Sequence, residues 1–280
     1  NIVAIRPMRD GVIADFDITE SMLRHFIEKV TGHSFMIRPR IMVCIPSCIT
    51  MVEQRAIQEA ALQAGARSTY LIEEPLAAAM GAGLDISEPY GSMVVDIGGG
   101  TTDVAVISLG GIVISDSLRV AGDKFDEAIM DYIKKEFNLM IGERTAENIK
   151  MEVGAAFPEA RHSKMNIRGR DLLTGLPKNI EVTTEQVSKA LESSVVQIVD
   201  CVKEVLEKCP PELASDIMDH GIILTGGGAM LYGLDELIRK ETQISTSLAE
   251  DPLSCVALGT GRALENIDKL DSKKSIAFWK

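Results

Sequence analysis

The sequence predicts an α/β protein, with strands and helices that alternate along most of the chain. Three observations favour this class: apolar runs that end at Gly or Pro, amphipathic segments of helical period between them, and capping boxes that open helices. The chain has 280 residues, of which 46% are apolar and 25% charged, so it can bury a sizeable core. It contains no run approaching the roughly 18 apolar residues of a membrane-spanning helix.

The first third of the chain predicts helices and strands in alternation. Acidic Asp17 would cap the first helix, and Gly32 would end it. Thr50 and Glu53 form a capping box that opens the second helix. The expected elements are a helix from 17 to 32, a strand over 41–45, a helix from 50 to 65, a strand over 69–72 and a short helix over 75–79.

The remainder of the chain contains two glycine triplets, each of which follows an apolar strand. Thr183 and Gln186 form another capping box, and Pro210 would end the long helix that it opens. Helical sequence follows the second triplet. We expect strands over 92–97, 102–108, 112–120 and 221–224, helices over 123–137, about 145–155 and 183 to 210, and a β-rich stretch over 158–182.

The two glycine triplets carry the main chemical signal. Without side chains, glycines let backbone N–H groups converge on an anion such as a phosphate. The first triplet, 98–100, follows Asp96, whose carboxylate can hold the water shell of Mg²⁺ beside phosphates, and Thr101 adds a hydroxyl. The second, 226–228, precedes helical sequence, and a helix N-terminus also attracts anions. One triplet alone is more often a tight hairpin, but two at strand ends predict a cleft clamped from both sides.

Charge, cysteines and absent motifs argue against other classes. Lys and Arg number 29 against 41 Asp and Glu, a net charge of −12, whereas nucleic acid as the main partner would need a basic face. The five cysteines include no CxxC pair, so we expect reduced structural thiols of a cytosolic protein. The sequence has no P-loop, no G-x-G-x-x-G opening a helix, no HExxH and no nucleophile elbow. It begins without a signal peptide and without Met, so we expect it to start inside a longer protein.

Several motifs together resemble the actin-like ATPase superfamily. They are DIGGGTTD at 96–103, TGGGA at 225–229 and EEPLAAA at 73–79. Two further segments, RPMRDGVIAD at 6–15 and AGDKFDEAI at 121–129, are similar to the MreB/Mbl family of bacterial actins that maintain rod shape. The likeness runs from about residue 1 to 267, and the motifs fit MreB and Mbl equally.

The resemblance implies an actin-like fold, in which two α/β domains of ribonuclease-H-like topology enclose a nucleotide cleft. Domain I would comprise 1–80 and 253–280 and lie near the membrane, and domain II would comprise 81–252 with a small subdomain over about 121–180. The family begins with a hairpin carrying D-x-G-T, the first phosphate loop, and nothing before Asp96 matches it. We therefore expect ATPase activity of the full-length protein, and an incomplete domain I and poor ATP binding in this chain.

The resemblance also assigns roles to individual residues. It places the second phosphate loop at Gly98, Gly99, Gly100 and Thr101, and the adenosine loop at Gly226, Gly227, Gly228 and Ala229. It places ribose contacts at Gly122 and Asp123, and adenine contacts at Glu147, Asn148, Ile149 and Lys150. Asp96 would hold Mg²⁺ through water. Glu74 would orient and polarise the attacking water, with Thr101 as a second catalytic group, while Mg²⁺ and loop amides stabilise charge on the transferring phosphoryl group of ATP.

Some of these residues also have purely structural interpretations. Glu73 or Glu74 could cap the helix that starts near Pro75, where an acidic first turn is favoured. Lys150 could lie on a solvated helix face. Asp103, at the end of the first motif, is interpreted as a surface charge on a strand and is left out of the site.

An apolar stretch between the first helix and the next strand predicts contact with a membrane. Phe35, Met36 and Ile37 are consecutive in an expected loop. Residues 21–40 carry four basic residues and one acidic residue, a local charge of 4 − 1 = +3 in an acidic protein. Apolar tips flanked by basic residues favour an anionic lipid surface, and the resemblance implies the same, because family members bind the inner membrane through such a loop. Alternatively, Phe35 and Ile37 are tucked into the core.

By resemblance, the function is ATP-dependent assembly of membrane-associated filaments that organise peptidoglycan synthesis and maintain rod cell shape. The implied partners are further copies in paired protofilaments, anionic inner-membrane lipid, transmembrane adaptors and cell-wall elongation enzymes, at the cytoplasmic face of the membrane. Two alternatives share the fold. A chaperone or cell-division ATPase would need a substrate-binding domain or a distinct insertion, and a small-molecule kinase would need an acceptor pocket with a catalytic Asp.

Overall fold

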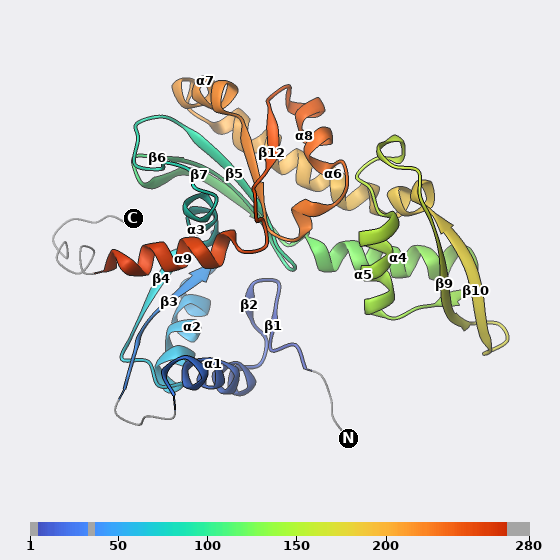
Figure 1. Cartoon of the computed structure of the whole chain (residues 1–280), viewed down its shortest axis with the longest axis horizontal. Helices are drawn as coiled ribbons and strands as arrows, with labels where there is room; N and C mark the ends of the chain where they lie inside the picture. Colours follow the sequence, from blue (N-terminus) through green and yellow to red (C-terminus); the bar gives the residue numbers. More distant parts are fainter. Residues whose placement is uncertain (1–4, 33–36, 268–280) are drawn as a thin grey trace.

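The centre of the molecule is a five-stranded mixed sheet (Figure 1). The computed structural model describes residues 5–32 and 37–267. The strands of this sheet are β5 Ser92–Ile97, β6 Thr102–Ser108, β7 Gly111–Leu118, β11 Ile222–Thr225 and β12 Thr246–Leu248. They lie in the order β12-β11-β5-β6-β7. The strands predicted over 92–97 and 102–108 are confirmed.

The pairing of β5 brings both glycine triplets to one edge of this sheet. β11 runs parallel to β5, with Thr225 opposite Asp96, so the two strands end side by side. β6 returns antiparallel to β5, with Thr102 opposite Ile97, which closes a tight loop over 98–101. Ligands of α/β sheets bind outside the carboxyl ends of the strands. The topology therefore places a candidate site at this edge.

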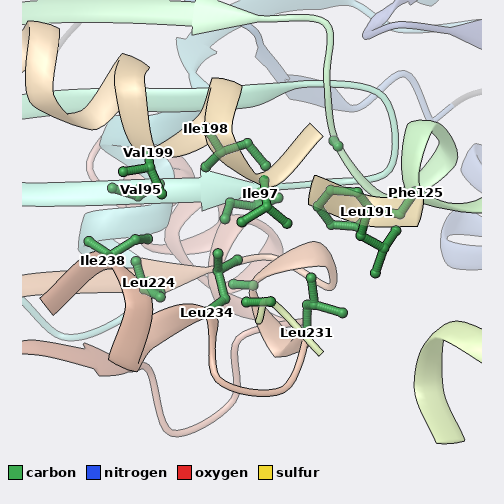
Figure 2. Close-up of a cluster of buried hydrophobic side chains, with 14 of the residues drawn as sticks. Val95, Ile97, Phe125, Leu191, Ile198, Val199, Leu224, Leu231, Leu234 and Ile238 are labelled. Carbon is green, nitrogen blue, oxygen red and sulfur yellow. The ribbon is translucent and has the colours of Figure 1, made fainter. Parts of the chain in front are cut away.

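One face of the sheet packs on the main hydrophobic core (Figure 2). Two helices lie against this face, α6 (Thr184–Lys208) and α8 (Leu234–Thr242), and α4 (Gly122–Phe137), which packs on α6, extends the same core. Val95 and Ile97 of β5 project into this core together with Leu224 of β11. Because alternate residues of a strand face opposite sides of a sheet, Asp96 lies on the other face.

That other face is covered by α3 (Glu74–Gly81) and α9 (Cys255–Glu265). Val94 of β5 packs there in one cluster with Leu76 of α3. The two helices touch through small residues: a Cβ added at Gly259 would lie 1.7 Å from the carbonyl oxygen of Ala77. Because only glycine permits this approach, α9 holds α3, and with it Glu74, against the sheet.

A second, two-stranded sheet consists of β3 (Arg40–Ile45) and β4 (Ser68–Glu73), which pair in parallel. The elements around it are the hairpin β1 (Met8–Arg9) and β2 (Val12–Ile13), α1 (Phe16–Thr31) and α2 (Met51–Gln63). Thr50 and Glu53 form the predicted capping box of α2. The prediction that Asp17 caps α1 is wrong. Asp15 has the extended backbone of a cap, and its carboxylate accepts a hydrogen bond of 3.0 Å from the Ile18 amide.

A smaller α/β region lies at the far end of α4 (Figure 1). It contains β8 (Leu139–Met140), α5 (Glu143–Val153), the 3₁₀ turn η1 (Pro158–Ala160), β9 (Lys164–Asp171) and β10 (Pro177–Thr183). The three strands form one antiparallel sheet in the order β10-β9-β8. The predicted β-rich stretch over 158–182 is confirmed, and α6 begins at the predicted capping box of Thr183 and Gln186.

Two short helical elements complete the described chain, α7 (Pro211–His220) and the 3₁₀ turn η2 (Gly228–Met230). No helix is predicted over 211–220, because the two prolines signal only the end of α6. Pro211 nevertheless starts α7, since the missing N–H of a proline is no loss at the first helical position. None of the helices in the described ranges combines the length and apolar character needed to cross a bilayer. All five cysteines are free thiols.

Candidate functional site

The two glycine loops open onto one cavity of about 280 Å³ at the carboxyl ends of β5 and β11. Its lining comes from segments far apart in the sequence: the β1–β2 turn, α3, both glycine loops and the chain that leads into α9. The lining residues are Gly11, Glu74, Asp96, Gly98, Gly99, Gly100, Thr101, Gly226, Gly227, Pro252, Leu253 and Val256.

The first glycine loop is held by backbone hydrogen bonds. The Gly98 amide donates to the Thr101 carbonyl at 2.9 Å, which closes the turn between β5 and β6. The amides of Gly122 and Asp123 donate to the carbonyls of Gly98 and Gly99 at 3.1 and 2.8 Å, so the loop caps the N-terminus of α4. A Cβ added at Gly98 or Gly99 would have its nearest neighbour at 3.4 or 3.9 Å, an ordinary van der Waals contact, so the protein does not pack tightly against either position.

The second glycine loop needs glycine for a different reason. Gly226 has a φ of +83°, and a Cβ there would lie 2.3 Å from the carbonyl oxygen of Ile97. This close approach joins the ends of β11 and β5. Gly226 and Gly227 line the cavity, whereas Gly228 and Ala229 start η2 and are buried. The structure thus brings only the first half of the predicted adenosine loop to the cavity surface.

Two predicted acidic residues line the cavity from opposite elements. Asp96 accepts a hydrogen bond of 2.8 Å from the Thr225 hydroxyl, and burial raises its pKa to about 6. Glu74 is the first residue of α3, and its pKa is raised to about 8 by burial and then by the charges of Asp103 and Asp96. The N-cap of α3 is Glu73, which makes no side-chain capping bond. Glu73 thus occupies the cap position and Glu74 supplies an acidic first turn, as the structural interpretation expects, but neither glutamate makes a side-chain capping bond.

The interpretation of Asp103 as a surface charge is wrong. Asp103 is fully buried, it accepts a hydrogen bond of 2.8 Å from the Ser47 amide, and burial raises its pKa. It lies directly across the tight loop from Asp96, as its partner on the neighbouring strand. The spacing of Asp96 and Asp103 in the sequence already indicates this arrangement, because two acidic residues that flank a short turn symmetrically must face the same side of a hairpin.

The residues predicted for the ribose and adenine are only partly brought together. The Lys150 ammonium lies 2.9 Å from the Asp126 carboxylate and 3.1 Å from the Gly122 carbonyl oxygen, so its placement on a solvated helix face is wrong. Ile149 is fully buried in the core. Glu147 is exposed and Asn148 half-buried on α5, away from the cavity lining. Asp123 pairs with Arg6 at 3.2 Å. Phe35 and Met36, predicted to contact a membrane, lie outside the described residues.

We expect Lys150→Met to lower the free energy of unfolding by about 3 kcal/mol, because it leaves the Asp126 carboxylate buried without its ion partner. Urea denaturation followed by circular dichroism measures the change. The double variant Asp126→Asn, Lys150→Met removes the stranded charge and should be clearly more stable than Lys150→Met alone. Equal stability of the two variants would contradict this role of the pair.

The residues of the cavity fit a magnesium nucleotide. Backbone of both glycine loops lines the cavity, and three acidic side chains gather at one end of the sheet. Burial raises the pKa of all three carboxyl groups, so negative charge is unfavourable at this end of the sheet unless a cation accompanies it. No three metal-binding side chains of residues 5–32 and 37–267 cluster closely enough to hold an ion by themselves. A cation here would share its ligands with phosphates and water, as Mg²⁺ commonly does.

Solved structures with this fold define the class as actin-like. MreB5 of Spiroplasma citri bound to ADP matches with a TM-score of 0.90 and 39% identity, over 96% of this chain and 80% of that one. The MamK double helical filament matches in fold with a TM-score of 0.78 and 21% identity, over 92% of this chain and 80% of that one.

The family follows from sequence similarity. A family model described as MreB/Mbl protein matches residues 1–272. The cell shape-determining protein Mbl of Bacillus subtilis (strain 168) is 56% identical over 98% of this chain and 82% of its own length. The cell shape-determining protein MreB of Escherichia coli (strain K12) is 56% identical over 96% of this chain and 78% of its own. The chain belongs to the MreB/Mbl family.

Proposed function

We propose that this chain is part of an ATP-dependent cytoskeletal protein that forms filaments at the inner face of the membrane, organises cell-wall synthesis and maintains cell shape. The observation that carries the proposal is the pair of glycine loops that end adjacent parallel strands and share one cavity with Glu74 and Asp96. The cell shape-determining relatives and the nucleotide-bound MreB5 structures support it.

Within this proposal each part of the cavity has one task. The backbone of Gly98 and Gly99, with the Thr101 hydroxyl, would bind phosphates, and Gly226 and Gly227 would bind the adenosine side. Asp96 would hold the cation through water. Further contacts would come from Gly122 and Asp123 to the ribose, and from Glu147, Asn148, Ile149 and Lys150 to the adenine.

The hydrolytic role falls to Glu74. A bound magnesium nucleotide would supply the transferable phosphoryl group and the positive charge that offsets the carboxylates. Glu74 would then accept the proton of the attacking water, since a carboxyl group with a raised pKa is a stronger base than a solvated one. Thr101, at the other side of the loop, would help to orient that water.

The finer features of assembly are part of the same proposal. Residues 1–80 with 253–280 and residues 81–252 would be two domains that close on the nucleotide, with 121–180 as a small subdomain. Phe35 and Met36 would enter an anionic inner-membrane surface, a role favoured by the exposed Ile37 and the basic Arg38 that follow them. Transmembrane adaptors and wall-elongation enzymes would bind the membrane-attached filament.

Electron microscopy of the full-length protein with ATP and anionic vesicles tests the proposal, and we expect paired filaments on the bilayer. Gly99→Val should abolish them, because a side chain at this position would occupy space beside the cavity, while its Cβ would come only within 3.9 Å of the Asp123 carboxylate. Gly142→Val is the matched control. Gly142 also has open space around it but lies outside the cavity, so filaments should persist.

Two other results would contradict the proposal. Dispersed monomers that turn over ATP would favour the kinase or chaperone-like alternatives, which coupled assays with sugars or acetate separate. Vesicle co-sedimentation that is unchanged in a Phe35→Ser, Met36→Ser double variant would remove the membrane role and leave the filament intact.

A further inference from the structure

Asp103 is a buried acidic residue for which the proposed function has no task. Its carboxylate lies on β6 beside the first glycine loop, fully buried. One oxygen, Oδ1, accepts the Ser47 amide at 2.8 Å, and the other has no hydrogen-bond partner. The hydroxyls of Ser117, Thr101 and Ser47 also favour the charged form of this carboxyl group, but the Ser47 amide does so most strongly. Burying a carboxylate is costly, so this bond needs an explanation beyond packing.

The bond connects the two sheets of the molecule. Asp103 belongs to the five-stranded sheet, whereas Ser47 follows β3 of the two-stranded sheet. In the parallel register of β3 and β4, Ile45 lies opposite Glu73, the residue directly before Glu74. The Ser47 amide therefore anchors the end of the small sheet at which Glu74 begins.

A second contact lies in the same place. Gly11, with a φ of +74°, sits between the two sheets: a Cβ on it would lie 2.5 Å from Cγ of Pro46 and 3.2 Å from Cγ2 of Thr101. The β1–β2 turn thus fills the space between the loop after β3 and the first glycine loop. We call this junction of Gly11, Pro46, Ser47, Thr101 and Asp103 the seam.

We propose that Asp103 is a positioning residue, whose hydrogen bond to the Ser47 amide fixes Glu74 relative to the first glycine loop. The chain of connection has three steps: Asp103 holds Ser47, Ser47 holds the end of β3, and β3 holds the end of β4 from which Glu74 starts. Asp103 contacts no reacting atom in this role. Its effect on hydrolysis rests on the proposed function of Glu74, whereas its effect on the seam does not.

Hydrogen–deuterium exchange of the ligand-free chain tests the proposal directly. Asp103→Ala should raise exchange in a peptide covering 70–77 about tenfold, because the end of β4 loses its anchor. Ser47→Pro should do the same, since it removes the amide donor, and the loss of the hydroxyl that accompanies it is controlled by Ser47→Ala. Ser47 is the second residue of a turn in which the Ile49 amide donates to the Pro46 carbonyl, a position where proline is favoured. The double variant should exchange no faster than either single one, because both remove one bond.

Three control variants distinguish the loss of the hydrogen bond between Asp103 and the Ser47 amide from the loss of the Asp103 charge and from general destabilisation of the protein. Asp103→Asn keeps an oxygen that can accept the amide, and Ser47→Ala keeps the amide, so both should retain slow exchange over 70–77. Asp116→Ala removes a half-buried carboxylate from the neighbouring strand β7 and should also leave this peptide protected. Exchange that is unchanged in Asp103→Ala, or as fast in Asp103→Asn as in Asp103→Ala, would overturn the proposal.

Steady-state kinetics of ATP hydrolysis then test whether the seam affects the reaction. Asp103→Ala and Ser47→Pro should each lower kcat for ATP about tenfold at unchanged KM, and Asp103→Asn should restore most of it. Wild-type full-length protein that neither binds nor hydrolyses ATP would contradict the proposed function, whereas the exchange result would still decide the role of the seam. If Asp103→Ala does not fold, Ser47→Pro and Asp103→Asn make the same comparison.

Discussion

Replacing Glu74 by Gln is expected to lower kcat for ATP hydrolysis at least about 100-fold, because the amide cannot take up the proton of the attacking water. The affinity for AMPPNP should change little, since glutamine keeps the shape of the side chain and leaves both glycine loops intact. Single-turnover hydrolysis and calorimetric titration measure the two effects. Hydrolysis at the wild-type rate in this variant would remove Glu74 from the reaction.

The pH dependence of hydrolysis follows from the surroundings of Glu74. Burial, followed by the charges of Asp103 and Asp96, raises its pKa to about 8. A general base works in its ionised form, so kcat/KM should rise with pH and level off above that value. The residual activity of the Gln variant should lack this rise, which serves as the control for other titrating groups.

The raised pKa of Glu74 also makes a prediction about stability. The folded protein holds this proton more tightly than the unfolded chain, in which the pKa is near 4.5. The stabilisation from the protonated carboxyl is therefore complete below pH 4.5 and is lost as the pH rises through about 8. Glu74→Gln should match the wild type at low pH and exceed its free energy of unfolding by about 1–3 kcal/mol at high pH. A less stable variant at high pH would contradict the assignment.

Gly259→Ala is expected to lower the free energy of unfolding by about 3 kcal/mol or more, because overpacking against backbone cannot be relieved by a side-chain rotation. The added Cβ would lie 1.7 Å from the Ala77 carbonyl oxygen, so α9 would have to move away from α3. Thermal unfolding of the purified chain measures the loss. Because α3 carries Glu74, hydrolysis should also fall at temperatures where the variant is still folded.

Gly261 provides the matched control on the same helix. A Cβ on Gly261 would meet no atom within 4 Å, and the residue is exposed. Gly261→Ala should therefore stabilise the protein by about 0.5–1 kcal/mol through the higher helix propensity of alanine. Similar losses in the two variants would show that the close contact of α3 and α9 is not the cause.

Local signals allowed much of the fold to be predicted. The strands around the first glycine triplet have the expected bounds, because two apolar runs separated by a short glycine turn form a hairpin whose ends are visible in the local sequence. The capping boxes at Thr50 and Thr183 also mark real helix starts. The predicted cap of α1 is wrong because Asp15 and Asp17 have the same capping side chain, and only the backbone path distinguishes them. Helix α7 was missed because a proline can both end one helix and begin the next.

The residues of the candidate site also fall into two groups, those that a local sequence pattern predicts and those that reach the site only through tertiary packing. The glycine loops and the acidic residues beside them belong to recognisable sequence motifs, and Glu74, Asp96 and Gly226 do line one cavity. The walls made by Gly11, Leu253 and Val256 have no local signal, because they reach the cavity only through tertiary packing. The burial of Gly228 and Ala229 likewise depends on the turn η2, which the triplet alone does not indicate.

The contact between α3 and α9 has a consequence for protein synthesis. The helix that carries Glu74 leaves the ribosome long before Gly259, with a face of small apolar residues that nothing yet covers. Contacts that close such a long loop form late, because ordering the intervening chain costs entropy before it gains any packing. The wall formed by Leu253 and Val256 belongs to the same late segment. A nascent chain therefore holds both glycine loops before it has a complete cavity, and the cavity closes only after α9 has been synthesised.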